Sequence, residues 1–303
     1  MSKRRIRVLL AAVAAFTVPV TVALAAQSAS ATGARSARSQ AAASAGSNQG
    51  KFESVCFYSH SAMDDPIVFP NQPGASPHLH DFLGNPSTDA NSTVASLQAA
   101  GTNCVNTLDF AAYWVPTLLK NATIPAGGGL PTGGTAIHPS SVTVYYLSNG
   151  KNNTQPFPLG LKEVAGNAHA TSPAQESGVF WGCSTTFPTS PTAPTCPSGS
   201  ELHVRVDFPD CWNGTTLDSA THTSHMAYSD GKGNCPAGFP VPVPELSILV
   251  KYPNPGTSNI LMSSGPTYTM HGDFIDAWDV GEMAKLTSVC LDAGVKCNRD
   301  TSF

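Results

Sequence analysis

Two pairs of residues in the sequence have the spacing of metal ligands on a strand. His78 and His80 are separated by one residue, and so are His271 and Asp273. Side chains at positions i and i+2 of an extended chain lie on the same face, so each pair could direct two ligand atoms at one ion. A His-x-His spacing alone is a weak signal, and this interpretation requires both pairs to meet in the folded chain.

A third motif adds an imidazole and a phenol, because Tyr228 follows His225 by three residues. Together the three motifs offer enough nitrogen and oxygen ligands for one zinc, copper or manganese ion. The predicted metal ligands are His78, His80, His225, His271 and Asp273. The predicted catalytic residues are His80, His225, Tyr228, His271 and Asp273. In this hypothesis Asp273 is a ligand or a base, and Tyr228 is a proton donor or a sugar contact.

Two other interpretations of the histidine motifs stay open. The imidazoles could act on or bind sugars without a metal, or they could only stabilise loops through hydrogen bonds. The histidines outside the three motifs are predicted to lie at the surface, and they are His60, His138, His169, His203 and His222.

Acidic residues late in the chain offer a rival chemistry. Two carboxylates at a suitable separation can act as acid and base in glycoside hydrolysis. The candidates are Asp207, Asp210, Asp218, Glu245, Asp273, Asp276 and Asp279. For any single one of them, capping a turn or a helix is the competing interpretation. The sequence has no G-x-S-x-G motif, which argues against a serine nucleophile.

Tryptophan and arginine side chains are candidates for substrate binding. Trp114, Trp212 and Trp278 could stack on sugar rings, although tryptophan more often packs in a protein core. Only two arginines follow residue 50, namely Arg205 and Arg299. A lyase that acts on uronates must neutralise a carboxylate, and Arg205 or a metal ion would carry out that task.

The charge distribution excludes one class of partner. Six of the 16 lysines and arginines lie in residues 1–50, which contain no acidic residue, so the rest of the chain has 10 cations against 20 acids. Nucleic-acid binding requires clustered cations, and we therefore expect no nucleic-acid partner. Neither a G-x-G-x-x-G motif nor a P-loop is present, so we expect no nucleotide cofactor.

The first 50 residues are typical of export rather than of a folded core. A basic start is followed by the apolar run Leu9–Ala26, and Ala23-Leu-Ala25 fits the small-x-small cleavage rule. We predict a signal peptide over residues 1–25 and a secreted, extracellular protein, with an uncleaved membrane anchor as the alternative. Residues 26–50 are rich in Ala, Ser and Gly and predict a disordered linker. No other stretch could span a membrane, and residues 51–303 are predicted to form a single β-rich domain.

The elements that would position these residues are mostly short strands. Alternating apolar runs predict strands at 142–147, 202–208 and 246–252, with further candidates at 110–115, 178–181 and 267–270. Two helices are predicted, one over about 92–100 and one that starts at Asp279 with Glu282 three residues later. Many strands with two short peripheral helices predict an all-β fold, an antiparallel β-sandwich or jelly roll.

Eight cysteines follow residue 50, and an even number in a secreted chain predicts disulfides. Sequence alone leaves the connectivity open. Closure of short loops favours the pairs Cys183–Cys196, Cys211–Cys235 and Cys290–Cys297, which leaves Cys56–Cys104.

A series of motifs also occurs in a characteristic order along the chain. The series includes Asp65-Pro-Ile-Val68, His78-x-His80, Tyr113-Trp-Val-Pro116, Phe208-Pro-x-Cys-Trp-Asn-Gly214, Ser224-His-Met-Ala-Tyr228 and His271-Gly-Asp-Phe274. Over nearly all of residues 55–290 the chain resembles the secreted bacterial and fungal family known as domain of unknown function nineteen-ninety-six. The resemblance implies a cell-wall or polysaccharide setting, because such domains often accompany WSC modules in fungi. Asn213 stands where the family commonly has Asp, and Asp276-Ala277 replaces a usual Asn-Gly.

The leading hypothesis is a secreted hydrolase or lyase that acts on an extracellular polysaccharide or cell-wall glycan. The alternatives are a non-catalytic carbohydrate- or metal-binding module of the cell envelope, and a structural envelope protein. A closed-in pocket of histidines beside carboxylates would favour the enzyme, and a flat aromatic face would favour the binding module. Nothing in the sequence indicates an oligomeric state.

Overall fold

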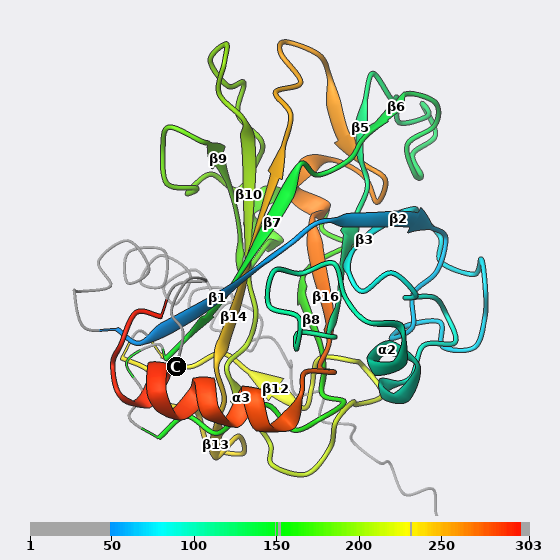
Figure 1. Ribbon diagram of the computed structural model, residues 1–303. Coiled ribbons are helices and arrows are strands. Elements are labelled where there is room, and N and C mark those ends of the chain that lie inside the picture. The colour runs from blue at the N-terminus through cyan, green and yellow to red at the C-terminus, as the bar shows by residue number, and fades with distance from the viewer. Residues whose placement is uncertain (1–48, 149, 151–152, 231, 298–303) are drawn as a thin grey trace, which may run out of the picture.

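The strands of the computed structural model form two five-stranded antiparallel sheets, accompanied by two three-stranded sheets (Figure 1). The structure describes residues 49–148, 150, 153–230 and 232–297. The predicted signal peptide and nearly all of the predicted linker lie outside the described residues.

The first sheet contains the strands with the clearest alternation. Its order is β1 (Lys51–Cys56), β7 (Ser141–Leu147), β14 (Glu245–Tyr252), β10 (Leu202–Asp207) and β9 (Val179–Cys183). In β7 the side chains of Val142, Val144 and Tyr146 share one face and are fully buried. β-Branched and aromatic residues at every second position favour a strand with one face in the core. The strands predicted at 142–147, 202–208 and 246–252 are confirmed as β7, β10 and β14.

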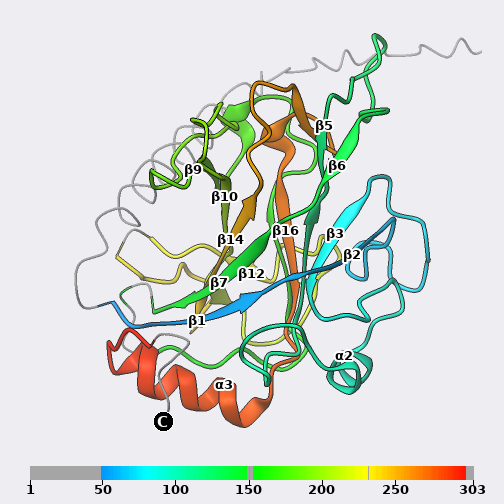
Figure 2. The same ribbon diagram turned by 45° about the horizontal axis from the view of Figure 1, so that its top comes forward.

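The second sheet is covered on both faces. Its order is β2 (Tyr58–Ala62), β3 (His80–Gly84), β4 (Ala112–Pro116), β16 (His271–Ile275) and β8 (Lys162–Gly166). One face packs on the first sheet, and Figure 2 shows the two layers side by side. On the other face, Ile67 of the segment 63–79 and Leu97 of helix α2 (Val94–Ala100) pack with Phe82 and Trp114. Every residue of β3, β4 and β16 is therefore buried.

Gly272 of strand β16 lies close against side chains of the first sheet. A Cβ atom at this position would lie 3.1 Å from Ile248 Cδ1 and 3.1 Å from Phe208 Cζ. Any side chain here would have to displace the core of the first sheet. Glycine at this position therefore keeps its neighbours His271 and Asp273 close to the sandwich.

The remaining elements are short. The two small sheets have the orders β12-β11-β13 and β15-β5-β6. Their strands are β5 (Leu118–Lys120), β6 (Thr135–Ile137), β11 (Cys211–Trp212), β12 (Met226–Ala227), β13 (Val241–Pro242) and β15 (Ile260–Met262). The second α-helix, α3 (Val280–Leu286), starts at the N-cap Asp279 as predicted and continues as the π-helical turn η3 (Thr287–Asp292). The 3₁₀ turn η1 spans Pro173–Gln175.

One predicted strand is wrong. Residues Thr267–Thr269 form the 3₁₀ turn η2, and the strand β16 begins only at His271. The hydroxyl of Thr269 donates to the carbonyl oxygen of Pro266 at 2.8 Å, and this local bond favours a turn over an extended ladder.

The predicted fold class is confirmed as mainly antiparallel β-sheet with two short α-helices. Three disulfides connect the pairs that short-loop closure favours, namely Cys183–Cys196, Cys211–Cys235 and Cys290–Cys297, and the fourth connects the remaining pair, Cys56–Cys104. No helix among the described residues has the length and apolar character that crossing a membrane requires.

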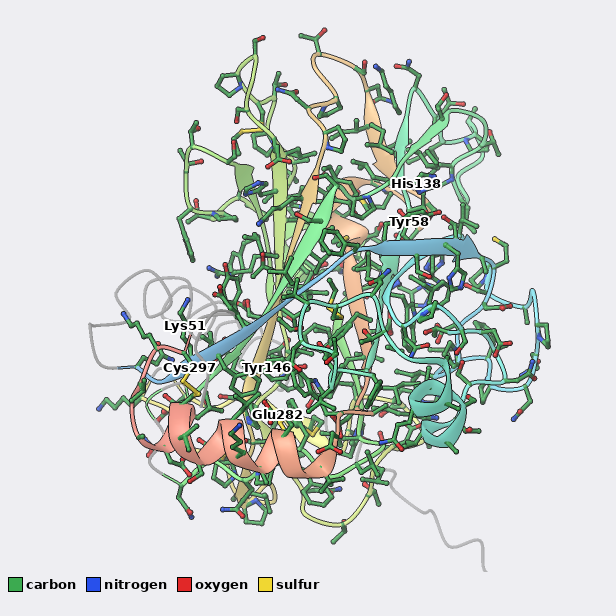
Figure 3. The ribbon with its side chains drawn as sticks, viewed as in Figure 1. Lys51, Tyr58, His138, Tyr146, Glu282 and Cys297 are labelled. Atoms are coloured by element: carbon green, nitrogen blue, oxygen red, sulfur yellow. A yellow bond between two sulfur atoms is a disulfide. The ribbon has the colours of Figure 1, made fainter. Side chains whose placement is uncertain are left out.

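The start and the end of the described chain lie side by side. The backbone N–H of Cys297 donates to the carbonyl oxygen of Lys51 at 2.8 Å, and the N–H of Lys51 donates to that of Val295 at 3.0 Å. Figure 3 shows Lys51 and Cys297 next to each other at the outer end of β1. The Cys290–Cys297 disulfide holds this segment against η3.

A buried chain of hydrogen bonds crosses the core between the sheets. Trp278 Nε1 donates to the Tyr146 hydroxyl at 2.8 Å, and the hydroxyls of Tyr146 and Tyr113 lie 2.6 Å apart. The Tyr113 hydroxyl donates to Asp109 Oδ1 at 2.9 Å. Burial raises the pKa of the Asp109 carboxyl from its ordinary 3.8 to about 7, because the hydrogen bonds that this carboxyl accepts offset only part of the desolvation.

Asp109 should make stability depend on pH in a defined direction. The folded-state pKa lies above the unfolded one, so the folded protein holds an extra proton between pH 3.8 and about 7. Stability from this group is therefore lost as pH rises through that window, by roughly 1.4 kcal/mol per pH unit. Asp109→Asn keeps the acceptor for Tyr113 and should remove this part of the slope. Urea unfolding of both proteins at several pH values measures it, and identical slopes would contradict the assignment.

Candidate metal centre

The outer face of the second sheet brings the predicted site residues together. His80 pairs with Pro116, and Asp273 pairs with Trp114. Directly paired residues share a face, and so do residues two apart on one strand. His80, His271 and Asp273 therefore point away from the first sheet. His78 belongs to the segment 63–79, which crosses this face just before β3.

Three imidazoles meet at this place. His78, His80 and His271 each offer a ring nitrogen within 4.8 Å of the other two. The Nε2 atoms of His78 and His271 lie 3.2 Å apart. The ring centroid of His80 lies 4.4 Å from that of His78 and 5.7 Å from that of His271. This arrangement brings the His-x-His pair and the histidine of the His-x-Asp pair together in space.

Backbone carbonyls fix the tautomers of the two most buried rings. His80 Nδ1 lies 2.9 Å from the carbonyl oxygen of Asp64, and His271 Nδ1 lies 2.9 Å from that of Thr269. A carbonyl oxygen can only accept, so both Nδ1 atoms carry the proton and both Nε2 atoms present a lone pair to the cluster. Histidines that bind metals are usually oriented in this way.

The Nε2 atom of His80 stands out because it has no hydrogen-bond partner among the described residues, although it is fully buried. Between His78 and His271 a single proton can serve as a bridge. His80 has no such neighbour for its lone pair. An unsatisfied buried acceptor costs about 1–3 kcal/mol.

All three imidazoles are neutral at physiological pH. Burial lowers the pKa of His78 to about 3, with a smaller contribution from His271. Burial likewise lowers the pKa of His271 to about 4. The pKa of His80 is lowered well below its ordinary value by burial first and by the other two imidazoles second. Neutral imidazole is the form that binds a metal ion.

A carboxyl group lies beside one of the three rings, that of His271. Asp273 Oδ2 is 4.0 Å from His271 Nε2, and this oxygen has no hydrogen-bond partner in the described part of the chain. Burial raises the pKa of Asp273 well above its ordinary value, and the nearby Asp65 carboxylate raises it further. Asp65 itself stabilises a turn within the segment 63–79, since its Oδ1 accepts from the backbone N–H groups of Ile67 and Val68.

Comparison with known protein families identifies the chain. The model of the family described as "Domain of unknown function (DUF1996)" matches residues 65–278. The chain belongs to this family. The match includes all three clustered histidines and Asp273, and it confirms the resemblance seen in the sequence motifs. No curated protein and no solved structure matched the chain.

The structure does not bring the fourth predicted histidine of this DUF1996 domain into the cluster. His225 Nε2 lies 2.7 Å from the carbonyl oxygen of Lys162, and its Nδ1 lies 3.1 Å from the hydroxyl of Ser219. Both nitrogens are therefore already used in protein hydrogen bonds. The Tyr228 hydroxyl donates to the carbonyl oxygen of Asp207 at 2.9 Å, on a strand of the first sheet.

The predicted substrate-binding residues of the domain lie mostly in its interior. Trp114 is 0% exposed and Trp278 is 1% exposed, so neither indole offers a face for stacking on a sugar. Trp212 is half-buried and donates its Nε1 hydrogen to the Thr216 carbonyl oxygen. Arg205 is buried, pairs with Asp207 at 3.0 Å, and lies between the rings of Phe180 and Phe187. Its charge is already compensated by a protein partner.

Two residues near the histidine cluster are not recognisable from the sequence. Asp65 stood in a family motif, but only the fold brings its carboxylate close to Asp273. His169 was predicted to lie at the surface and is indeed exposed, yet its charge lowers the pKa of both His78 and His271. Gly166, three residues earlier, pairs with His271 in the ladder between β8 and β16. That pairing places His169 at the rim of the cluster, and no local sequence signal announces it.

Proposed function

We propose that His78, His80 and His271 bind one divalent transition-metal ion. The observation that carries the proposal is the fully buried, unpartnered Nε2 atom of His80, directed at two further imidazoles. A metal ion would use this lone pair and would replace the proton between His78 and His271. Asp273 is the candidate fourth ligand, since its free oxygen lies 4.0 Å from His271 Nε2.

The donor set favours zinc or copper. Imidazole nitrogen suits both ions, whereas magnesium and calcium prefer shells of oxygen atoms. Two nitrogens of a tetrahedral zinc site lie about 3.3–3.4 Å apart when the bonds are 2.0–2.1 Å long. The Nε2 atoms of His78 and His271 are 3.2 Å apart, which is close to that separation. Manganese, with its preference for oxygen ligands, fits this centre less well.

We further propose that the centre acts on an extracellular polysaccharide as a hydrolase or lyase. A bound divalent ion would supply Lewis-acid polarisation of a glycan oxygen or of water. Asp273 would hold or release the proton beside it, because a neighbouring cation favours the ionised carboxylate that burial now opposes. His78 is only partly buried and marks the side from which a substrate could approach.

Three observations support the extracellular setting. The N-terminal sequence has the pattern of a signal peptide, and four disulfides are typical of proteins in oxidising compartments. The family resemblance adds the association with WSC modules of fungi. These observations support the location and the glycan as a class.

A non-catalytic metal- or carbohydrate-binding module is the second candidate. The burial of His80 and His271 favours it, because their exposures of 0% and 5% leave only His78 near the surface. A closed metal site stabilises a fold, whereas a catalytic one keeps an open coordination position.

One experiment separates these candidates. Elemental analysis of untagged protein should find about one zinc or copper ion per chain. The loaded and the chelator-treated protein are then incubated with a panel of polysaccharides, and new reducing ends and unsaturated sugar ends are measured separately. Release that chelation abolishes supports an enzyme, and metal without release supports the binding module. A protein without bound metal, to which added zinc or copper also fails to bind, contradicts the proposal.

A further inference from the structure

The turn between Met262 and Gly265 is unusual because its tip is buried. Met262 and Gly265 exchange backbone hydrogen bonds of 2.8 and 2.9 Å, so Ser263 and Ser264 are the two central residues of a tight hairpin. Residues at such tips normally face water. Here the exposed fractions are only 6% for Ser263 and 7% for Ser264, so their hydroxyls must find partners inside the protein.

The Ser263 hydroxyl holds the segment that carries the His-x-His pair. Ser263 Oγ donates to the carbonyl oxygen of Leu79, the residue between His78 and His80, at 2.6 Å. The backbone N–H of Thr117 donates to the same oxygen at 2.9 Å, and the N–H of Ser263 donates to the Thr117 carbonyl oxygen at 2.8 Å. The peptide group between the two histidines is thus anchored from the side of the turn.

The Ser264 hydroxyl contacts Thr269, in the turn just before the strand that begins with His271. Ser264 Oγ lies 3.1 Å from the carbonyl oxygen of Thr269 and 2.8 Å from its hydroxyl. The same carbonyl oxygen accepts the proton of His271 Nδ1 at 2.9 Å. The Thr269 hydroxyl donates its own hydrogen to Pro266, so the single Ser264 hydrogen is shared between the Thr269 hydroxyl and the Thr269 carbonyl oxygen. With its two lone pairs that carbonyl oxygen can accept from both Ser264 and His271. Ser264 therefore acts on the group that orients the His271 ring.

We propose that Ser263 and Ser264 are positioning residues that set the distance between the His78/His80 pair and His271. This inference rests on the proposed metal centre and identifies the groups that hold its ligands in place. Two neighbouring hydroxyls on one rigid turn hold two segments that the chain order keeps far apart. The turn fixes how closely the Nε2 atoms of His78 and His271 approach, now 3.2 Å, and so favours an ion with short bonds to nitrogen.

Titration of the whole protein with zinc tests the inference. Loss of an outer-shell partner lowers metal affinity by roughly 10–100-fold, and we expect this loss for Ser263→Ala and for Ser264→Ala. Ser263→Thr and Ser264→Thr keep the hydroxyl and should recover most of the affinity. The absorption spectrum of the cobalt-substituted protein should change in the alanine variants, because the ligand geometry changes. A purely structural role would lower the melting temperature without moving this spectrum.

Ser247→Ala is the matched control, since Ser247 is also buried and its Oγ donates to Asp207 Oδ1 at 2.7 Å, but on strand β14 of the first sheet, away from the turn and the cluster. It should leave zinc affinity unchanged. Folded alanine variants of the turn that bind zinc with wild-type affinity and an unchanged cobalt spectrum would overturn the inference while the metal centre stands. If the wild-type protein itself binds no zinc in this titration, the proposed centre fails, and the inference fails with it. If one alanine variant does not fold, the other decides, because the inference predicts the loss of affinity and the changed cobalt spectrum for each of them.

Discussion

His80→Ala is expected to abolish metal binding, with a loss of affinity greater than the roughly 100-fold typical of an outer-shell partner. The Nε2 atom of His80 is buried and has no hydrogen-bond partner among the described residues. Its removal leaves two imidazoles, which can satisfy each other by the 3.2 Å contact between their Nε2 atoms. Competition with a chromogenic chelator measures the affinity of both proteins for zinc and copper.

His225→Ala provides the matched control for this experiment. His225 is also buried, and both its nitrogens are hydrogen-bonded outside the cluster. Its loss should lower stability and leave metal affinity intact. Equal loss of metal in the two variants would mean that the effect comes from damage to the fold. Full metal binding by folded His80→Ala would refute the centre.

Removal of the Cys56–Cys104 disulfide should produce the largest loss of stability among the four. The bond closes a loop with a sequence separation of 48, and the chain-entropy model then gives about 4 kcal/mol. The Cys290–Cys297 bond closes a loop of only 7, for which the same model gives about 2.4 kcal/mol. The first bond also lies in the core beside Asp109, so its loss leaves a defect in packing.

Denaturant unfolding of the paired alanine variants tests this ranking. Cys56→Ala/Cys104→Ala should unfold at a clearly lower urea concentration than Cys290→Ala/Cys297→Ala. The reverse order would show that the contact between the two ends of the chain outweighs loop closure. Thiol titration of each denatured variant checks that the other three bonds have formed.

The sequence predicts the first sheet well and the second sheet poorly, for a physical reason. In β7 one face is in the core and the other is near solvent, so alternation survives and marks the strand. Strand β3 reads His-Asp-Phe-Leu-Gly and is buried on both faces, so nothing alternates. The strands that carry the candidate site are therefore those without a clear periodic signal.

The spacing of the histidines predicts part of the site. The His-x-His and His-x-Asp pairs identify residues that share a face, because that relation is local. Whether two pairs meet depends on the order β3-β4-β16 in the sheet, which no local pattern encodes. The same limit explains His225. Its motif is as suggestive as the others, but the strand that follows it, β12, pairs with β11 in one of the small sheets.

The contact between Lys51 and Cys297 suggests a way to rewire the chain. Chains with adjacent ends tolerate circular permutation when the new opening lies in an exposed loop, and residues 123–130 form such a loop. In the natural order His78 and His271 are 193 residues apart. A permuted chain of residues 51–297 opened in this loop, with Lys51 and Cys297 joined by a short linker, would bring β16 and the His-x-His segment to within roughly 60 residues of each other. The metal ligands would then assemble across a shorter loop, and a lower contact order should speed folding of the sheet that holds them.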